Sequence, residues 1–332
     1  MTSPQITVVT AIRNGAAYIE ETIQSVQAQD FADWEYIIVD DASTDDTPAI
    51  VERAAKADSR IQLLRRSDSA GPYVAANDAL PLCAGKYIFR TDGDDLCPPG
   101  RFSRQLKFMQ EHPEFRASVG FWQGFDQRGI MPHVVTIPHS PRVFKWHLLL
   151  RSASIHSTAC FETAALRELG GYVPVALSQD YRMWCTLAQR NWLGVIPEVL
   201  SYVRFHEGRS TNQRTDLQRT LAMGILRDYW RELTGEHLTN EEIDDLWAVA
   251  YSLPHDVRRA LRMLERWEQH WSQDPALTSS ERRELMKLRD LRSWKMLRGN
   301  LRRQPFNALT SVSSLRELSA SLGGLRQALF SR

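Results

Sequence analysis

Short β-like runs alternate with helical segments through the first third of the chain, and this alternation limits the fold more than any other feature. Runs rich in β-branched and aromatic residues predict strands at residues 6–10, 35–39, 61–64 and 87–89. The segments between them carry apolar residues at helical spacing, as at residues 16–29. Strands that alternate with helices form βαβ units, so we predict an α/β fold with a mostly parallel sheet flanked by helices.

The rest of the sequence predicts a mixed middle region and a helical end. Helices are predicted at residues 162–169 and 179–190, and further strands at residues 117–125, 131–137, 155–161, 194–196 and 200–204. From about residue 212 the pattern is almost entirely helical, with tryptophans recurring among charged residues. We therefore predict an α/β domain over residues 1–212 and a helical extension over residues 213–332.

The composition is that of a folded protein with a sizeable core. Of the 332 residues, 43% are hydrophobic, and the longest apolar runs are far too short to span a bilayer. The N-terminal segment has no basic region before its apolar run, so no signal peptide is predicted. The four cysteines are scattered without a C-x-x-C pair, which predicts reduced thiols and a cytoplasmic location.

Acidic residues cluster directly after two of the predicted strands. The stretch after the fourth strand reads TDGDD and places three carboxylates within four residues, beginning at Asp92. Asp40 and Asp41 follow the second strand, and the loop of residues 10–14 follows the first. Ligands of such sheets bind at the carboxyl ends of the strands, so we expect these segments to meet at one edge.

Two common kinds of binding loop do not fit these residues. A calcium loop counted from Asp92 has Ser103 where glutamate is required, and one counted from Asp41 has Asp46 where glycine is required. A dinucleotide site needs G-x-G-x-x-G after the first strand, whereas the sequence there is AIRNGAAY. No G-x-x-x-x-G-K-[ST] segment occurs, so NAD, FAD and P-loop sites are not expected.

A divalent cation with a phosphate group accounts best for the pair Asp92 and Asp94. Capping of helices and turns is the alternative, and it suits Asp45, Asp46 and Asp95 better than two carboxylates that repel each other at a strand end. Mg²⁺ and Mn²⁺ use one or two carboxylates and keep their other positions for water and substrate phosphates. We therefore predict Mn²⁺ or Mg²⁺ as a cofactor.

Several motifs, in this order and spacing, resemble those of family 2 glycosyltransferases. The first are TVVTAIRNGAAYIEETIQSVQAQ, WEYIIVDDASTDDT and NDALPLCAGKYIFRTDGDD, and the later ones are HSTACFETAALRELGGY, SQDYRMWCTL and VIPEVLSYVRFHEGRST. The resemblance covers roughly residues 4–212. It implies the GT-A fold, whose Rossmann-like sheet would have a nucleotide-sugar-binding half in residues 1–98 and an acceptor-binding half in residues 99–212.

The resemblance assigns the donor site to the first half of this domain. Thr10 and the loop after it, including Arg13, would line the nucleobase pocket. Asp40 and Asp41 would lie at the base and ribose, where a carboxylate can accept the uracil N3–H. Asp92 would face the ribose and the metal. A UDP-linked sugar is accordingly the expected donor.

The resemblance also implies a metal site and a catalytic base. Asp94 would bind the cation and bridge it to the diphosphate, and His206 would approach the cation from a C-terminal loop. Asp180, at the start of a predicted helix, would be the catalytic base, with helix capping as the alternative role. Three positions depart from the residues usual in the family: Arg13 in place of tyrosine, Ala76 in place of arginine and Gln179 in place of an acidic residue.

The implied activity is inverting transfer of a sugar from a nucleotide-diphosphate donor to a hydroxyl of a saccharide or lipid-linked acceptor, as in bacterial surface polysaccharide synthesis. The metal would stabilise the leaving diphosphate, and the base would deprotonate the acceptor on the opposite side of the sugar. The alternative is a nucleotidyltransferase or a nucleotide-sugar-binding protein without transfer. The lone Gly15 counts against the former, and the presence of Asp94 and Asp180 counts against the latter. No nucleic acid is expected as a partner.

Basic residues are concentrated at the C-terminal end. Residues 281–332 carry 12 Lys and Arg against 4 Asp and Glu, although the net charge of the chain is +1. From Leu285 apolar residues recur at three- and four-residue steps with cations between them. One hypothesis is a helix that packs on the catalytic domain. The other is a helix that lies, with residues 306–330, on the anionic inner face of the cell membrane with Trp294 at the headgroups, which would make the protein peripheral there.

Overall fold

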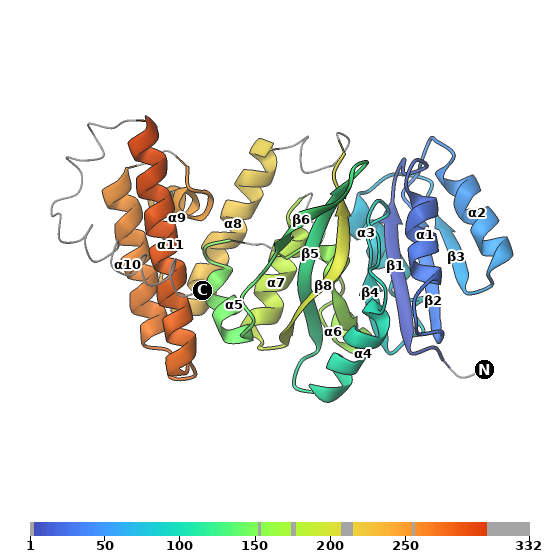
Figure 1. Cartoon of the computed structure of the whole chain (residues 1–332), viewed down its shortest axis with the longest axis horizontal. Coiled ribbons are helices and arrows are strands. Elements are labelled where there is room, and N and C mark those ends of the chain that lie inside the picture. The colour runs from blue at the N-terminus through green and yellow to red at the C-terminus, as the bar shows by residue number, and fades with distance from the viewer. Residues whose placement is uncertain (1–2, 152–153, 174–176, 207–214, 254–255, 304–332) are drawn as a thin grey trace. The chain divides into compact units, whose positions relative to one another are not determined.

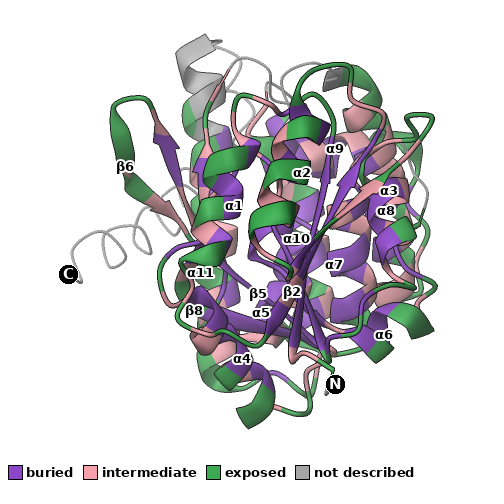
Figure 2. Ribbon diagram, turned by 90° about the vertical axis from the view of Figure 1, so that its right-hand side faces the viewer, coloured by how far each residue is buried: buried purple, intermediate pink, exposed green. Residues whose placement is uncertain are grey.

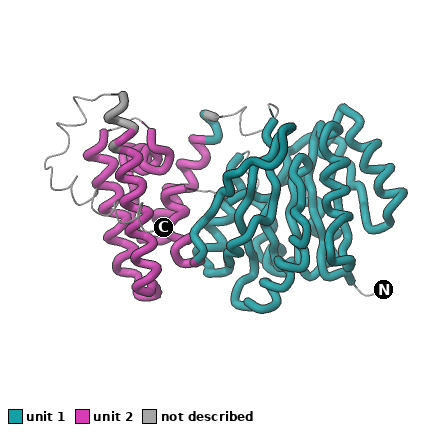
Figure 3. The backbone as a smooth tube through the Cα atoms, in the orientation of Figure 1, with its two compact units in different colours: residues 1–139, 153–218 teal, residues 140–152, 219–332 magenta. Residues whose placement is uncertain are grey.

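The computed structural model describes most of the chain, in five segments: residues 3–151, 154–173, 177–206, 215–253 and 256–303 (Figure 1). The chain divides into two compact units. Unit 1 comprises residues 1–139 and 153–218, and unit 2 comprises residues 140–152 and 219–332 (Figure 3). The predicted boundary after residue 212 lies outside the described residues. That division also placed residues 140–152 in the α/β domain, whereas they cluster with the helical unit.

Unit 1 is built on an eight-stranded sheet (Figure 1). Its strands are β1 (Ile6–Ile12), β2 (Trp34–Asp40), β3 (Ile61–Arg65), β4 (Tyr87–Arg90), β5 (Ala117–Asp126), β6 (Gly129–Val135), β7 (Cys160–Glu162) and β8 (Leu193–Arg204). The order is β3-β2-β1-β4-β7-β5-β6, with β8 paired to β5. Parallel pairs join β1 to β2 and β4, β2 to β3, and β5 to β8, whereas β7 is antiparallel to both of its neighbours and β6 to β5. The predicted α/β class is confirmed.

Helices cover both faces of this sheet and bury its central strands β1, β2 and β4, whereas the edge strand β6 is largely exposed (Figure 2). These helices are α1 (Ile19–Gln27), α2 (Thr47–Ala57), α3 (Pro72–Ala79), α4 (Arg101–Glu111), α6 (Thr163–Glu168) and α7 (Gln179–Gln189). Successive side chains of β1 alternate between the faces. Ile6 and Val8 belong to a core cluster with apolar residues of α1, α2 and α4, and Val9 points to the opposite face and is equally buried. Burial on both faces explains why this strand is apolar almost throughout.

Two predicted elements of the middle region differ in the structure. The strand predicted at residues 155–161 is a 3-10 turn, η1 (His156–Thr158), followed by the short β7. The hydroxyl of Thr158 donates to the carbonyl oxygen of Ile155 at 2.9 Å, a local bond of the kind that competes with extended structure. The strands predicted at residues 194–196 and 200–204 are one strand, β8, which shifts register where it passes Phe121.

Unit 2 is helical, as its tryptophan-rich sequence predicts. It contains α5 (Pro141–His147), α8 (Thr215–Thr234 in part), α9 (Asn240–Tyr251), α10 (Val257–Ser272) and α11 (Ser279–Arg303). The indole N–H of Trp267 donates to the carbonyl oxygen of Trp146 at 3.0 Å, and the Trp146 indole donates to Asp274 Oδ2 at 3.1 Å. The Tyr229 hydroxyl donates to the carbonyl oxygen of Lys145 at 3.0 Å. These bonds attach α5 to α8, to α10 and to the segment after α10, across 84 to 128 residues of sequence.

The basic helix α11 packs against α5, α9 and α10. Leu285 and Met296 are buried there, and Arg292 is buried with Nη1 donating to the Ala250 carbonyl oxygen at 2.7 Å. Leu291, which the sequence placed on the apolar face, is 42% exposed. This part of the helix is therefore packed, as the first hypothesis expected, but on the helical unit and not on the catalytic domain that the hypothesis named. Residues 306–330 lie outside the described residues, and no helix in the described part is long and apolar enough to cross a membrane.

Gly85 is required by the close approach of two chain segments at the start of β4. A Cβ added there would lie 2.4 Å from the Thr7 backbone nitrogen and 2.6 Å from the Ile6 carbonyl carbon, whereas one added to Gly224 in α8 would have nothing within 4 Å. We expect Gly85→Ala to destabilise the protein by about 1–3 kcal/mol through overpacking. The matched Gly224→Ala should instead stabilise it by up to about 1 kcal/mol, because alanine favours the helix. Urea unfolding measures both, and shifts of the same sign would contradict this packing.

Candidate active site

A cavity of about 310 Å³ lies at the carboxyl ends of β1 and β4. Its lining comes from the loop after β1, the start of α3, the acidic segment after β4, η1 and the end of β8, and consists of Ala11, Ile12, Arg13, Asn14, Gly15, Tyr18, Pro72, Tyr73, Arg90, Asp92, Gly93, Asp94, Asp95, His156 and His206. Four of the predicted site residues are therefore brought together: Arg13, Asp92, Asp94 and His206. The expected convergence of strand ends accounts for the first three, which follow β1 and β4.

Asp95 fastens the acidic segment to two distant parts of the chain. Its Oδ2 accepts a hydrogen bond from Ser157 Oγ at 2.5 Å, and its Oδ1 accepts from the backbone N–H of Arg204 at 3.1 Å. Ser157 Oγ in turn accepts from the backbone N–H of Asp92 at 3.0 Å. Burial, together with the charges of Asp94 and Asp92, raises the pKa of Asp95 well above its usual range. Its partners show that Asp95 is more than the local cap considered from the sequence.

Asp94 and His206, the predicted metal ligands, lie side by side. Asp94 Oδ2 and His206 Nε2 are 2.9 Å apart, and Arg204 Nε donates to the Asp94 carbonyl oxygen at 3.0 Å. The ring of Tyr18 packs beside that of His206, with ring centroids 4.6 Å apart. His206 thus reaches Asp94 from the end of β8, 112 residues away.

This pair fits a divalent cation that completes its coordination with substrate or water. No three His, Cys, Asp or Glu side chains of the described segments form a group that could hold a metal. Mg²⁺ and Mn²⁺ do not need such a group, since they bind one or two protein ligands with phosphate oxygens. Neighbouring ligands of an octahedral ion with bonds of about 2.1 Å lie about 3 Å apart. Asp94 Oδ2 and His206 Nε2 share a 2.9 Å contact, the length of a hydrogen bond between them, which also leaves both atoms close enough to bind one ion.

Asp92 lies next to a buried cation. Arg90 Nη2 is 3.8 Å from Asp92 Oδ1, and Arg90 Nη1 donates to the Val9 carbonyl oxygen at 3.0 Å. The Arg90 side chain is 1% exposed and that of Asp92 is 44% exposed. The guanidinium therefore places a fixed positive charge beneath a carboxylate that faces the cavity.

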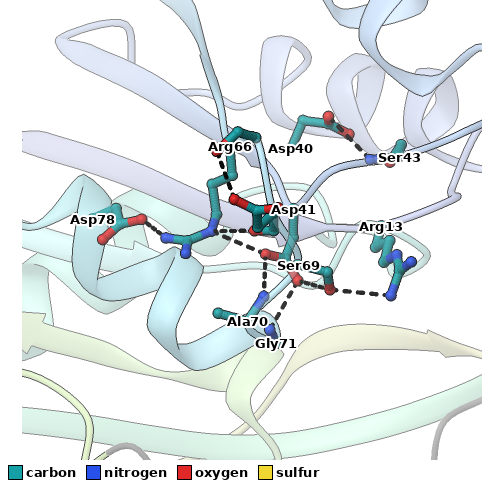
Figure 4. A network of polar contacts seen from close by, with 11 residues as sticks. Arg13, Asp40, Asp41, Ser43, Arg66, Ser69, Ala70, Gly71 and Asp78 are labelled. Atoms are coloured by element: carbon teal, nitrogen blue, oxygen red, sulfur yellow. Dashed lines mark hydrogen bonds and ion pairs between the residues drawn. The ribbon is translucent and has the colours of Figure 1, made fainter.

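Asp41 is occupied by a network that shapes the loop before α3 (Figure 4). Its oxygens accept hydrogen bonds from Ser69 Oγ at 2.7 Å, Ala70 N–H at 3.0 Å and Gly71 N–H at 2.9 Å. In addition, Arg66 Nε lies 3.1 Å from Asp41 Oδ1. Burial opposes ionisation, but these hydrogen bonds and the arginine outweigh it and lower the pKa of Asp41. The structure thus gives Asp41 a role in folding this loop, and its contact with the base or ribose of a donor stays a prediction.

Three other predicted residues surround this network. Asp40 is buried, with Oδ2 accepting from the Ser43 N–H at 3.2 Å and Oδ1 without a partner among the described residues (Figure 4). Arg13 Nη1 donates to Ser69 Oγ at 3.1 Å, and Ser69 donates to Asp41, so Ser69 links the Arg13 side chain to the Asp41 carboxylate. Thr10 does not line the cavity.

The Thr10 hydroxyl lies inside the sheet, where it donates to the Thr91 carbonyl oxygen at 2.6 Å and is 2.8 Å from the Tyr36 hydroxyl. Thr10 lies two residues from both Val8 and Ile12 in β1, so its side chain is on the same face of the sheet, in the core that α1 covers. The prediction that Thr10 contacts a nucleobase is therefore corrected, while the loop that follows it does line the cavity.

Asp180 stands in the first turn of α7, a helix held down by buried Met183, Trp184 and Leu187. Its Oδ1 accepts from the Tyr181 N–H at 2.7 Å. Burial raises the pKa of Asp180 to about 6, with the charge of Asp92 adding to the effect and the Tyr181 bond opposing it. Such a carboxyl group is ionised at neutral pH and is a stronger base than an exposed aspartate.

Comparisons with known proteins identify the family of this chain. A family model described as Glycosyl transferase family 2 matches residues 7–168. A protein of Bacillus subtilis (strain 168) named as a teichuronic acid biosynthesis glycosyltransferase, TuaG, is 40% identical over 192 residues, which are 57% of this chain and 74% of TuaG. The chain belongs to glycosyltransferase family 2. A second protein of that organism, named as the glycosyltransferase EpsE, is 29% identical over 207 residues, or 60% of this chain and 73% of EpsE.

Solved structures show that this family 2 glycosyltransferase has the GT-A fold. S. aureus TarS 1-349 in complex with UDP-GlcNAc matches with a TM-score of 0.59 and 20% identity, over 94% of this chain and 92% of that one. The mannosyltransferase PcManGT from Pyrobaculum calidifontis, in complex with GDP-Man and Mn²⁺, matches with a TM-score of 0.50 and 18% identity. That match covers 99% of this chain and 81% of PcManGT.

Of the other residues around the cavity of this glycosyltransferase, only some could have been predicted from the sequence. Arg90 could have been noticed as a charge inside the apolar strand YIFR. Ser157 and Arg204 could not, because they contact Asp95 across 62 and 109 residues. His156 lies in the motif that carried the family resemblance, without an assigned role.

Asp41 and Asp40 differ in their contacts, which gives a matched test of the loop network. Asp41→Asn removes an acceptor from the loop donors and should lower the free energy of unfolding by about 1–3 kcal/mol. Asp40→Asn should change it by less than about 1 kcal/mol, because Asp40 has one such bond. A lowered folded-state pKa stabilises the protein above pH about 4 and no longer does so at lower pH, so the defect of Asp41→Asn should shrink on acidification. Urea titrations at pH 7 and pH 3.5 measure this, and equal stability of both variants at pH 7 would contradict the network.

Proposed function

We propose that the chain is an inverting glycosyltransferase that moves a sugar from a nucleotide-diphosphate donor to a hydroxyl of a saccharide or lipid-linked acceptor. The observation that carries the proposal is the grouping of Asp92, Asp94 and His206 in one cavity, with Asp180 close enough for Asp92 to raise its pKa. Leaving-group stabilisation and base catalysis are the two requirements of this reaction, and the site offers a residue set for each.

The donor and the biological role are supported by the related proteins. TarS structures contain UDP or UDP-GlcNAc, and the PcManGT structure contains GDP-Man. These make a nucleotide-sugar the donor class, and UDP the nucleotide that we propose. The name of TuaG refers to teichuronic acid biosynthesis, which favours synthesis of a bacterial surface polysaccharide.

Asp94 and His206 would hold the cation, Mn²⁺ or Mg²⁺, and Asp92 and Asp94 would form the D-x-D pair of the site. When bound, the ion would supply Lewis-acid stabilisation of the negative charge that grows on the leaving diphosphate. The other residues of the site hold these two ligands in position. Arg204 fixes the backbone of Asp94 through a 3.0 Å hydrogen bond, and Tyr18 packs against the ring of His206.

Asp180 would be the general base. As the acceptor hydroxyl attacks the anomeric carbon, the carboxylate takes its proton and the bond to the diphosphate oxygen breaks. A pKa of about 6 keeps the group ionised at neutral pH while leaving it basic enough to accept that proton. Attack from the side opposite the leaving group inverts the anomeric configuration, which nuclear magnetic resonance of the product can establish.

A protein that binds nucleotide-sugars without transferring them remains the second candidate function. The bonds of Asp41 within its loop do not distinguish the two functions, because both require the nucleotide-sugar to bind. The raised pKa of Asp180 favours transfer, since a binding protein has no need of a carboxylate poised as a base.

The membrane association and cytoplasmic location stay predictions. The membrane prediction is supported by the excess of basic residues after residue 280, since such segments bind anionic lipid surfaces, and the cytoplasmic prediction by the four scattered cysteines. The apolar contacts of α11 do not add support, because Leu285 and Met296 are buried within the helical unit.

Turnover should depend on a divalent cation through Asp94. With Mn²⁺, the protein is expected to hydrolyse or transfer the sugar of one donor in a panel of UDP-, GDP- and dTDP-sugars. EDTA or Asp94→Ala should reduce turnover by roughly 10²–10³-fold, because the leaving diphosphate loses its electrostatic stabilisation. Asp46→Ala, which alters an exposed aspartate whose side chain makes no helix-cap bond, is the control. Full turnover of Asp94→Ala in EDTA would refute the metal site.

Asp180→Asn separates chemistry from donor binding. Turnover should fall on the order of 10²–10⁴-fold, the usual contribution of a positioned base, while donor affinity changes little. In the unmodified protein kcat/KM should decline as the pH falls through about 6, because protonation then removes the base. That decline should be missing in Asp180→Asn. A variant that loses donor affinity instead, with kcat preserved, would assign Asp180 to the donor site.

A further inference from the structure

One guanidinium group joins the two ends of the acidic segment, and the reaction proposed above leaves it without a role. Arg101, at the start of α4, is 0% exposed. Its Nη1 donates to Thr91 Oγ1 at 3.1 Å and to Cys97 Sγ at 3.3 Å. The Thr91 hydroxyl and the Cys97 thiol are themselves 3.3 Å apart. Since Thr91 directly precedes residues 92–96 and Cys97 directly follows them, Arg101 closes this segment at its base.

The remaining donors of Arg101 bind the strand and the turn beside the acidic segment. Nη2 donates to the carbonyl oxygens of Arg90 at 2.8 Å and Ala159 at 3.4 Å, and Nε donates to Gln105 Oε1 at 3.2 Å. Gln105, one turn later in α4, donates to the carbonyl oxygen of Thr158 at 2.8 Å. A guanidinium carries its N–H groups in a planar fork, and all of its nitrogens are used here. We call Arg101 and its acceptors the Arg101 clamp.

The Arg101 clamp contains a buried charge that no carboxylate neutralises directly. Among the described residues no acidic side chain forms an ion pair with Arg101, and none of its hydrogen-bond acceptors is a carboxylate. Burying such a charge costs free energy, and an apolar side chain of similar volume fills a core at lower cost. The charge lies instead at the base of a segment with three carboxyl groups, which it attracts. This placement favours a role in holding the acidic segment over simple filling of the core.

We infer that Arg101 is a positioning residue of the proposed reaction, because it closes the segment that carries Asp92 and Asp94 and so fixes where these two carboxylates lie. This inference rests on the proposed function. The described residues that line the cavity do not include Arg101, so it acts through the carboxylates and does not touch the substrate. The hydrogen bonds of Asp95 hold one residue of the segment, whereas the Arg101 clamp holds both of its ends.

Arg101→Lys tests the Arg101 clamp, because it keeps the charge and loses the fork. An ammonium group donates from a single nitrogen and cannot reach acceptors on every side of a guanidinium. With the donor that the panel identifies, kcat should fall and the Mn²⁺ concentration for half-maximal turnover should rise, each by about 10-fold. Backbone hydrogen exchange of residues 91–97, measured by mass spectrometry on the protein without Mn²⁺, should become faster.

Two control variants separate positioning from a general loss of stability. Arg104→Lys makes the same change three residues later in α4, where the arginine binds the carbonyl oxygens of Gly100 and Pro99 and the carboxylate of Glu198. It should leave the Mn²⁺ requirement within about 2-fold and the exchange of residues 91–97 unchanged. Gly85→Ala, before the start of β4, destabilises the protein through overpacking and should leave the Mn²⁺ requirement unchanged at a temperature where the variant is folded.

Thr91→Val keeps the test decisive if Arg101→Lys does not fold, because it removes one acceptor and retains Arg101. Its Mn²⁺ requirement should rise by about 2- to 10-fold, the effect of one hydrogen bond. An unchanged Mn²⁺ requirement and unchanged exchange in the folded variant would overturn the positioning role and leave the proposed function standing. An equal rise in Gly85→Ala would also overturn it, because the effect would then follow stability. If the unmodified protein turns over no donor of the panel, the proposed function fails, and the exchange of residues 91–97 alone then supports or overturns the clamp.

Discussion

The rest of the site depends on the two hydrogen bonds that the carboxyl group of Asp95 accepts. This group joins the acidic segment after β4 to Ser157 in η1 and to the backbone of Arg204 at the end of β8. Ser157 also accepts a hydrogen bond from the backbone N–H of Asp92, and the Arg204 side chain donates one to the carbonyl oxygen of Asp94. Loops that follow different strands are thereby held in one arrangement, which a sheet alone does not provide.

This arrangement places like charges close together, and the protein offsets them with cations. Burial raises the pKa of Asp95 most, and the charges of Asp94 and Asp92 raise it further. Arg90 Nη2 lies 3.8 Å from Asp92 Oδ1, and Arg204, which also pairs with Glu21, donates to the Asp94 carbonyl oxygen at 3.0 Å. Two carboxylates still face the cavity, so a divalent cation with its phosphate ligands would relieve a cost that the protein alone retains.

The sequence predicts the part of this structure that depends on local patterns. Runs of β-branched residues define β1 to β4, and the rule for strand ends brings Arg13, Asp92 and Asp94 to one edge. The same alternation could have shown that Thr10 points into the core with Val8. The bond from Asp95 to Arg204 spans 109 residues and the Asp41 network folds a separate loop, so neither leaves a local signal. For the same reason the attachment of α5 to the helical unit through Trp267 became visible only in three dimensions.

The central claim is that the strand ends form one donor site around Asp94 and His206. Anomalous diffraction from a crystal of the full chain grown with Mn²⁺ and the nucleotide of its donor tests it most directly. The account predicts a manganese peak within coordination distance of Asp94 Oδ2 and His206 Nε2, with the diphosphate bound to the same ion. A nucleotide bound elsewhere, or a manganese peak remote from both side chains, would contradict it.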